Sequence, residues 1–276
     1  MKHILLSCVN YNSYIELVDY LQSIDDAAEQ VKELVRVDVV ISDNSINKKK
    51  INTSGYTSIN CRIFLNENIG YLGGALSSIN LSDLSNYDFV IISNVDLKLS
   101  TSFFLNIINI DLTDRGLDIT NIGWITPRIF TPKTQKDENP LMLKRPTKTK
   151  LILLELLYKM DFLEGLYVYF YGFRHRERKY LSSQSSCEIY AGHGSLMIFT
   201  QKFFLQNKNL VFPSFMYMEE IYFAELVRLS DLKTVYIPSI YVESIGNVST
   251  GFLGYKKRCS MSLDSLSKIR KMFFSS

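Results

Sequence analysis

The sequence predicts an α/β fold in which one mixed sheet of the Rossmann type is flanked by helices, with a helical portion towards the C-terminus. Three short apolar runs, at residues 4–9, 37–41 and 89–92, have the length and composition of strands that are covered on both faces. Amphipathic patterns at residues 14–35 and 101–110 predict helices between and after them. This alternation is typical of a parallel sheet with helices on both faces.

The composition is that of a folded globular protein. The 276 residues are 46% hydrophobic and 21% charged, and the net charge of +3 is too small to indicate nucleic acid binding. The cysteines Cys8, Cys61, Cys187 and Cys259 are far apart and form no C-x-x-C pair, so neither a zinc knuckle nor a disulfide framework is expected. We therefore expect a protein of a reducing compartment, the cytoplasm.

Residues 1–127 form the first half of the predicted domain and residues 128–276 the second half. In the second half, the polar residues 133–150 with two prolines predict a loop, and residues 151–160 predict a helix. Residues 133–186 as a whole are expected to be mobile or to face a membrane. Strands at residues 187–199 and 234–237 surround a helix that starts near residue 219, and a loop rich in glycine, serine and threonine follows at residues 244–251.

The sequence also bears on contact with a membrane. The N-terminus leads into the first apolar run without a cleavage site, so no secretory signal is expected. No segment reaches the roughly 20 consecutive apolar residues that span a bilayer. Basic residues gather near apolar ones, which fits either peripheral contact with an anionic membrane or a solvated basic face. The basic clusters are residues 144–150, 174–179, 256–258 and 268–271, and the apolar runs are 166–173 and 272–274.

Polar side chains follow each of the predicted strands. Asn10 and Tyr11 follow the first strand, Asp43 follows the second, and Asn94 and Asp96 follow the third. Because parallel sheets bind ligands at the carboxyl ends of their strands, these residues are candidates for a binding site. An isolated aspartate at a strand end is more often a helix cap, but a glycine-rich segment upstream of Asp96 favours a ligand site.

That glycine-rich segment contains Asn68, Gly70 and Gly74 and precedes a predicted helix. Its glycines allow a close approach of the backbone to a ligand. The pattern matches neither the dinucleotide-binding fingerprint nor the phosphate-binding loop, which ends in Gly-Lys-Ser/Thr.

Glu219 and Glu220 stand at the start of a predicted helix, where the helix dipole favours negative charge. Their proximity would raise the pKa of one carboxyl group, which also suits a general base. His193 stands between two glycines and fits a packed histidine as well as a ligand.

In order and spacing, six motifs resemble those of family 2 glycosyltransferases with a GT-A fold, particularly the rhamnosyltransferase-like and the capsule or O-antigen enzymes of bacteria. The resemblance covers residues 3–250. The motifs are VNYN at residues 9–12, ISDNS at 41–45, NIGYLGG at 68–74, NVD at 94–96, GHGS at 192–195 and YMEE at 217–220.

The resemblance implies a nucleotide-sugar donor, UDP- or dTDP-linked, and a glycan or lipid-linked acceptor. It implies that Asn10, Tyr11 and Asp43 contact the base and ribose, and that Asn68, Gly70 and Gly74 line the same pocket. Asn94 and Asp96 occupy the place of the D-x-D motif. Asp96 is therefore the implied ligand of Mg²⁺ or Mn²⁺, which neutralises charge on the departing diphosphate.

By the same resemblance, Glu220, with Glu219 as the second choice, is the general base of an inverting transfer, and His193 lies between the donor sugar and the acceptor. Two departures weaken the expected metal dependence: Asn94 replaces an aspartate, and Ser244 stands where many relatives have a histidine. The Q-x-x-R-W signature is missing, which favours transfer of a single sugar.

Two alternatives stay open. The first is a non-catalytic or degenerate protein that binds sugar nucleotides. The second is a sugar nucleotidyltransferase, for which residues 4–14 lack the usual glycine-rich loop with arginine and lysine.

Overall fold

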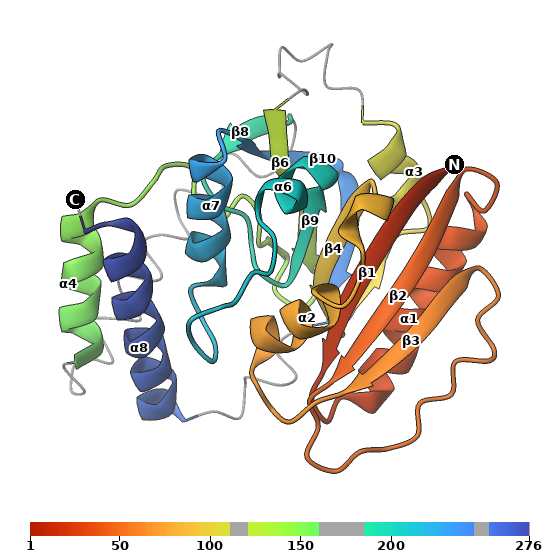
Figure 1. Cartoon of the computed structure of the whole chain (residues 1–276), viewed down its shortest axis with the longest axis horizontal. Helices are drawn as coiled ribbons and strands as arrows, with labels where there is room; N and C mark the ends of the chain where they lie inside the picture. Colours follow the sequence, from red (N-terminus) through yellow and green to blue (C-terminus); the bar gives the residue numbers. More distant parts are fainter. Residues whose placement is uncertain (111–120, 160–184, 246–253, 276) are drawn as a thin grey trace.

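The computed structural model describes residues 1–110, 121–159, 185–245 and 254–275 (Figure 1). The strands are β1 (Lys2–Asn10), β2 (Val35–Asp43), β3 (Ile59–Leu65), β4 (Phe89–Asn94), β5 (Leu97–Leu99), β6 (Ile122–Thr131), β7 (Lys136–Asp137), β8 (Cys187–Ile189), β9 (Leu196–Thr200) and β10 (Lys233–Ser244). The helices are α1 (Tyr14–Glu29), α2 (Tyr71–Ile79), α3 (Phe103–Ile108), α4 (Lys148–Lys159), α6 (Gln201–Gln206), α7 (Glu219–Leu229) and α8 (Tyr255–Phe273), with a 3-10 turn η1 at Leu84–Asn86.

All described strands belong to one mixed sheet with the order β3-β2-β1-β4-β9-β6-β10-β5, to which β7 and β8 add through β6 and β10. The first four strands are parallel: β1 lies between β2 and β4, and β2 also pairs with β3. Strand β9 then runs antiparallel between β4 and β6. The expected fold class, a single mixed sheet flanked by helices, is confirmed.

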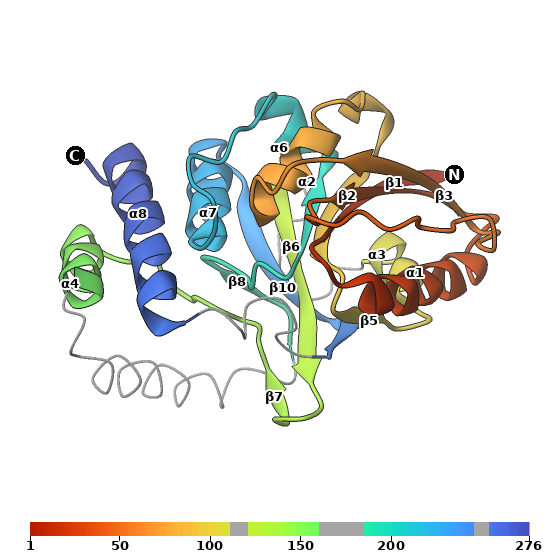
Figure 2. The ribbon, with the colours of Figure 1, turned by 90° about the horizontal axis from the view of Figure 1, so that it is seen from below.

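Each face of the sheet has its own hydrophobic core. One core packs α1 and α3 against the sheet, with Leu17 and Phe103 fully buried. The other packs α2, α6 and α7 against the opposite face, with Phe199 and Phe223 at its centre. Figure 2 shows these helices above and below the sheet, and α4 and α8 beyond α7. The helical portion expected towards the C-terminus is therefore present.

Several element boundaries differ from the expectation. The helix predicted at residues 14–35 ends at Glu29, because the chain turns and enters β2 at Val35. The strand predicted at residues 234–237 extends to Ser244. Residues 133–150 contain β7 and the start of α4 rather than only a loop. The predicted apolar run 166–173 and the basic cluster 174–179 lie outside the described residues.

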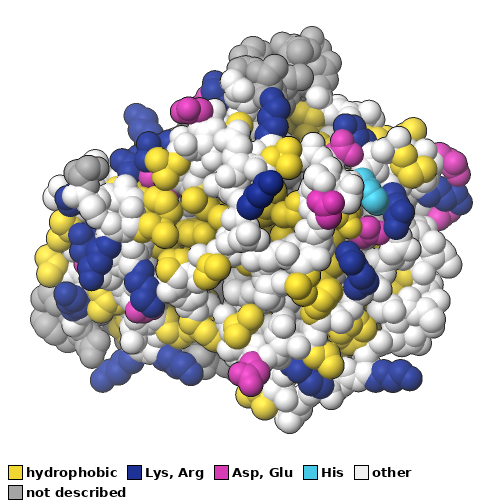
Figure 3. Space-filling view, in the orientation of Figure 1, with side chains coloured by type: hydrophobic (Ala, Val, Ile, Leu, Met, Phe, Trp, Pro, Cys, Tyr) yellow, Lys and Arg dark blue, Asp and Glu magenta, His cyan; other side chains and the backbone are white. Residues whose placement is uncertain are grey.

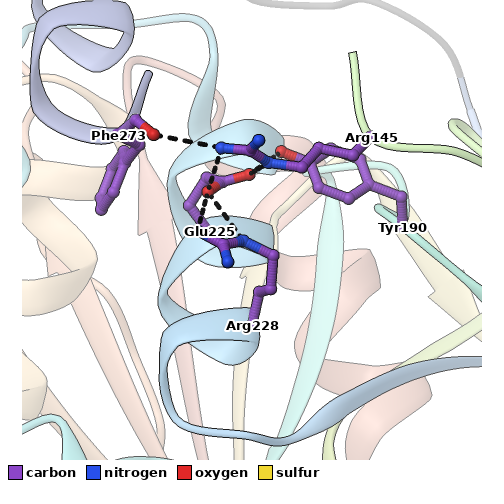
Figure 4. Close-up of polar contacts among 5 residues, drawn as sticks. All are labelled: Arg145, Tyr190, Glu225, Arg228 and Phe273. Atoms are coloured by element: carbon purple, nitrogen blue, oxygen red, sulfur yellow. Dashed lines mark hydrogen bonds and ion pairs between the residues drawn. The ribbon is translucent and has the colours of Figure 1, made fainter. Parts of the chain in front are cut away.

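A buried carboxylate ties α7 to the C-terminal helices (Figure 4). Glu225 on α7 is fully buried and accepts hydrogen bonds from Arg145 at 2.7 and 3.0 Å. Arg228 and the Tyr190 hydroxyl donate to the same carboxylate. Arg145 also donates to the carbonyl of Phe273 at the end of α8. Burial raises the pKa of Glu225, but these donors outweigh burial and hold it below its usual value.

Candidate active site

The side chains at the ends of β1 and β2 form one hydrogen-bond network. Asn10 donates from Nδ2 to Oδ1 of Asp43 at 3.1 Å and to Oγ of Ser45 at 3.2 Å. The Tyr14 hydroxyl, at the start of α1, donates to Oδ2 of Asp43 at 2.8 Å. Asp43 is fully buried and also accepts from the Ser45 amide at 3.1 Å. A carboxylate can accept about four hydrogen bonds, so these three partners leave room for about one more donor. Tyr11 lies half-buried directly after this strand end.

Lys48 makes three backbone contacts at the same end of the sheet. Its ammonium group donates to the carbonyls of Asp43 at 2.7 Å and of Ser45 and Asn66 at 2.6 Å. An ammonium group has three donors, and all three are used here. The lysine therefore fixes the chain after β2 to the chain after β3. The sequence gives no signal for this role, because all three partners are backbone atoms.

The glycine-rich segment is shaped by close contacts within the protein. Gly70 has a φ of 83°, and a Cβ atom there would lie 1.9 Å from the carbonyl oxygen of Phe215. A Cβ atom at Gly74 would lie 2.7 Å from the side-chain nitrogen of Asn44, which donates to the carbonyl of Gly70 at 2.8 Å. Asn68 is exposed, and its Oδ1 accepts from the Gly70 amide at 3.3 Å. These glycines thus allow two other parts of the chain to approach α2.

The dipeptide Gly194–Ser195, directly before β9, contacts three of the predicted motifs. The Asn94 amide donates to the carbonyl of Ser195 at 2.8 Å. The Tyr71 hydroxyl donates to the carbonyl of Gly194 at 2.8 Å. The Gly194 amide donates to Oε1 of Glu220 at 3.3 Å. The end of β4, the start of α2 and the start of α7 therefore meet at one short stretch of backbone.

The two adjacent glutamates at the start of α7 have different surroundings. Glu219 is buried, and its Oε1 accepts from the Tyr217 amide at 2.8 Å. Burial and the neighbouring Glu220 carboxylate raise the pKa of Glu219 to about 8, so Glu219 is largely protonated at neutral pH. Glu220 is half-buried beside Gly194. A general base must be ionised and reachable, and Glu220 meets the second condition better than Glu219.

Tyr71 lies among the acidic residues of the site. Burial raises the pKa of Tyr71 far above its ordinary value, and the negative charges that Glu219, Glu220 and Asp96 carry at high pH raise it further. The phenol therefore stays neutral and acts as a hydrogen-bond donor. Asp96, from the fourth of the six motifs, and Glu220, from the sixth, both lie within electrostatic range of this one side chain.

His193 is held by its neighbours in a defined orientation. Its Nδ1 accepts from the Ser195 amide at 3.2 Å and lies 2.9 Å from the Ser195 hydroxyl. Its own amide donates to Oδ1 of Asn139 at 2.7 Å. Because Nδ1 is an acceptor, the arrangement favours the tautomer with its hydrogen on Nε2.

Comparison of the sequence with protein-family models and with curated proteins gives no match. Solved structures do match. GalNAc-T7, crystallised with UDP, GalNAc and Mn²⁺, superposes with a TM-score of 0.62 at 12% identity, over 99% of this chain and 49% of that one. Residues 1–349 of S. aureus TarS, in complex with UDP-GlcNAc, give 0.56 at 11% identity, over 99% of this chain and 72% of that one.

Both of these proteins are glycosyltransferases with the same mixed sheet and flanking helices. The chain has a GT-A fold. It spans about half the length of the GalNAc-T7 chain that it matches. At these identities the similarity establishes the GT-A fold alone, and an activity has to be argued from the site.

GalNAc-T7 was crystallised with Mn²⁺, so the ligands that this chain could offer to a divalent cation are of interest. In this GT-A fold, Asp96 is buried between β4 and β5, and its carbonyl accepts from the Ile245 amide at 3.0 Å. No group of three or more His, Cys, Asp or Glu among the described residues could hold a metal. The Asp96 carboxylate and the Asn94 amide oxygen are hard donors of the type that Mg²⁺ and Mn²⁺ accept. They fit a cation held partly by substrate phosphates.

Two parts of the expected site remain to be placed. Ser244, which the resemblance sets at the place of a histidine, is the last residue of β10 and is half-buried. The loop predicted after it, up to residue 251, lies mostly outside the described residues. The residues that the sequence analysis did not name as site residues are Tyr14 and Lys48 near the strand ends. Ser45 and Gly194 lay inside predicted motifs but had no role assigned to them.

Proposed function

We propose that the protein is an inverting glycosyltransferase that moves one sugar from a UDP- or dTDP-linked donor to a glycan or lipid-linked oligosaccharide, in the biosynthesis of a surface polysaccharide on the cytoplasmic side of the membrane. The observation that carries the proposal is the contact of Gly194–Ser195 with Asn94, Tyr71 and Glu220 within a GT-A fold. This contact brings a candidate base next to the strand ends at which parallel sheets bind ligands.

The donor nucleotide would lie at the ends of β1 and β2. Asn10, Tyr11 and Asp43 would contact the base and ribose, with Asp43 accepting from a base or sugar donor. The support is the buried network that fixes Asp43 before any ligand arrives, since a preorganised group loses little freedom on binding. Asn68, Gly70 and Gly74 would form the wall of the same pocket.

The diphosphate would lie beside Asn94 and Asp96. A Mg²⁺ or Mn²⁺ ion held there by the Asp96 carboxylate and the phosphates would neutralise the charge of the leaving nucleoside diphosphate. The single carboxylate gives the protein a weak hold on free metal. We therefore expect the cation to bind together with the donor.

The transfer step would use Glu220 as the general base. The Glu220 carboxylate takes the proton of the acceptor hydroxyl while that oxygen forms a bond to the anomeric carbon. On the opposite face of the sugar, the bond from the anomeric carbon to the diphosphate oxygen breaks, and the electron pair leaves with the nucleoside diphosphate. The configuration is therefore inverted. His193, with its hydrogen on Nε2, would lie on the wall between the donor sugar and the acceptor.

A thermal-shift panel tests the donor site. UDP-, dTDP- and GDP-sugars are added with Mg²⁺, Mn²⁺ or chelator to the wild-type protein and to Asp96→Ala. A ligand at about 100 times its dissociation constant adds roughly 2.7 kcal/mol, a shift of several degrees. We expect a UDP or dTDP series to stabilise the wild type with metal and to lose the metal-dependent part in the variant. No shift with any nucleotide would contradict the proposal.

Catalysis is tested separately with Glu220→Gln, using Glu188→Gln as a control because Glu188 is an exposed carboxylate on β8. Loss of a general base lowers the rate about 10²–10⁴-fold. We expect Glu220→Gln to keep the donor-induced thermal shift and to lose glycan formation in a complementing strain. Unchanged glycan formation would rule out this role for Glu220.

The two alternative functions give different results in the same assays. A degenerate sugar-nucleotide-binding protein is favoured by the asparagine at position 94, where the motif has an aspartate. Its wild type would show the donor-induced thermal shift but no sugar transfer. A sugar nucleotidyltransferase would release pyrophosphate from a nucleoside triphosphate and a sugar 1-phosphate.

A further inference from the structure

Helix α4 carries an apolar face on its outer side as well as on its inner side. Leu151 and Tyr158 on the inner side are buried in the core that α7 and α8 share. Ile152, Leu153 and Leu156 are 38%, 57% and 50% exposed. Residues three or four positions apart lie on the same side of a helix, so these three side chains form one outward strip.

Lysines border this strip along its whole length. Lys148 is four positions before Ile152, Lys150 is three before Leu153, and Lys159 is three after Leu156, so each lysine lies next to an apolar residue of the strip. All three lysines are exposed, and Lys150 and Lys159 form no ion pair with a described residue. The strip is therefore both apolar and positively charged.

The last turn of α8 adds to the same edge of the molecule. Lys148 donates to the carbonyl of Ser275, and Arg270 pairs with Glu155, which places the end of α8 beside α4. Lys271 and Met272 in this turn are exposed, Met272 by 58%. Figure 3 shows apolar and basic side chains mixed along the edge of the molecule that α4 and α8 form.

Other members of the basic and apolar clusters are already paired with carboxylates or buried. Arg145 is bound to Glu225, Arg270 to Glu155, and Lys268 to Asp264. Phe274 is only 3% exposed. The membrane contact suggested by residues 144–150 and 268–274 is thus narrowed to the outer strip of α4 and the last turn of α8. None of the described helices is long and apolar enough to cross a membrane.

We propose that the outer strip of α4, with Lys271 and Met272 of α8, docks on an anionic membrane surface. The apolar side chains enter the boundary between headgroups and acyl chains, and the lysines contact lipid phosphates. Charge favours a membrane over other partners, because lysines on both sides of the narrow apolar strip can contact the negatively charged headgroups of a flat anionic lipid surface. The choice of a lipid surface rests on the proposed function, in which the acceptor can be lipid-linked.

Vesicle co-sedimentation of the full chain tests the docking face. Vesicles of phosphatidylcholine alone are compared with vesicles that also contain phosphatidylglycerol. Wild-type protein should sediment with the anionic vesicles and stay in the supernatant with the neutral ones. High salt should weaken the binding, because it screens the lysine contacts. The double variant Leu153→Ser/Leu156→Ser should lose at least about tenfold in partition coefficient, because it removes two leucines that would enter the membrane.

The matched control is Leu81→Ser/Leu229→Ser, since these leucines are 70% and 60% exposed and lie elsewhere on the molecule. It should bind vesicles like the wild type. All four positions are exposed, so Tm should change little in either double variant. Equal sedimentation of Leu153→Ser/Leu156→Ser and wild type would overturn the proposal, as would wild type that stays in the supernatant with both vesicle types.

Further outcomes distinguish membrane docking from dimerisation and from the proposed glycosyltransferase function. A concentration-dependent dimer that Leu153→Ser/Leu156→Ser dissociates, without vesicle binding, would assign the strip to a second copy of the chain and overturn the lipid assignment. Donor-induced thermal shifts in lipid-free buffer report on the proposed function alone. Donor binding without vesicle binding removes only the docking face, and vesicle binding without donor binding removes only the glycosyltransferase assignment.

Discussion

The hydroxyl of Tyr71 donates to the carbonyl of Gly194 at 2.8 Å, although the two residues are 123 positions apart. The contact joins the first turn of α2 to the turn before β9. The amide of the same glycine donates to Glu220. Tyr71 is thus linked to the candidate base through one backbone residue, and we regard it as a positioning residue.

Replacing Tyr71 by phenylalanine should therefore affect the rate more than donor binding. The change leaves the carbonyl of Gly194 without its tyrosine partner, which costs about 1–3 kcal/mol for a buried acceptor. We expect a Tm lower by several degrees, a lower kcat and a nearly unchanged KM for the donor. Tyr56→Phe is the control, because Tyr56 makes a 3.4 Å contact in an exposed part of the protein. An equal effect on kcat and KM would argue against positioning.

The free energy of unfolding should decrease as pH rises because of Glu219. Its folded-state pKa of about 8 lies above the unfolded value of 4.5. Between these values the folded state holds a proton that the unfolded state has lost, so the free energy of unfolding decreases as pH rises and levels off above about pH 8. Each unit of pKa difference corresponds to about 1.4 kcal/mol.

Glu219→Gln removes this titration while keeping an oxygen for the Tyr217 amide. We expect Glu219→Gln and wild type to have similar Tm values at pH 5, and Glu219→Gln to be the more stable protein at pH 9. Thermal denaturation across this range measures the difference. Glu188→Gln, at an exposed position, should follow the wild type. A constant difference between Glu219→Gln and wild type at all pH values would mean that Glu219 does not carry the effect.

Gly70→Ala should destabilise the protein strongly. Gly70 has φ 83° and ψ 172°, a region that costs other residues of order 1–3 kcal/mol. Its new Cβ would also collide with the carbonyl oxygen of Phe215, which would be 1.9 Å away. We expect a Tm lower by about 5 °C or more. Gly55→Ala is the control, since a Cβ there meets nothing within 4 Å. Similar Tm values for both variants would show that the chain around Phe215 moves freely.

Arg145→Ala should loosen the attachment of α8 to α7. Glu225 is fully buried, so loss of this donor leaves a charge less well compensated, at a cost of roughly 2 kcal/mol. The expected effect is a Tm lower by about 5 °C and faster proteolysis near the C-terminus. Lys233→Ala removes the exposed pair with Glu188 and should cost less than about 1 kcal/mol. Equal effects would contradict the role of the buried carboxylate.

The sequence predicted the strand ends well because buried parallel strands leave an unbroken apolar run. The runs at residues 37–41 and 89–92 lie inside β2 and β4, and the polar residues after them do lie at one edge of the sheet. The start of α7 at Glu219 was also predicted. In each case the signal is local, since a few neighbouring residues carry it.

Elements with weak local patterns were not assigned to particular residues from the sequence. Strand β3 is an edge strand with the polar residues Asn60 and Arg62 in it, so its apolar run is broken. Helix α8 belongs to the helical portion expected towards the C-terminus, but its bounds were not predicted, because its buried stripe is narrow, includes Ser262 and Ser265, and lies among many charged residues. Packing against α4 and α7 supplies the stability that its composition does not indicate.

The assembly of the site depends on contacts that leave no trace in the sequence. Gly194 takes part through its amide and its carbonyl, which every residue possesses. Similarly, Lys48 binds three carbonyl groups, and nothing in its neighbourhood marks it as different from Lys49 or Lys50. Side-chain type predicts candidate chemistry, whereas such backbone contacts emerge only with the tertiary fold.

The edge strand β5 has consequences for the order in which the chain folds. Leu97 and Leu99 pair with β10, which is made much later in synthesis. The amide of Ile245, just after β10, also binds the carbonyl of Asp96. A nascent chain that has not yet reached β10 can join β1, β2, β3 and β4, but Asp96 still lacks this backbone partner. The backbone contact between the candidate metal-binding residue and the chain after β10 therefore forms only when the ribosome has delivered β10, later than the pairing of the first four strands.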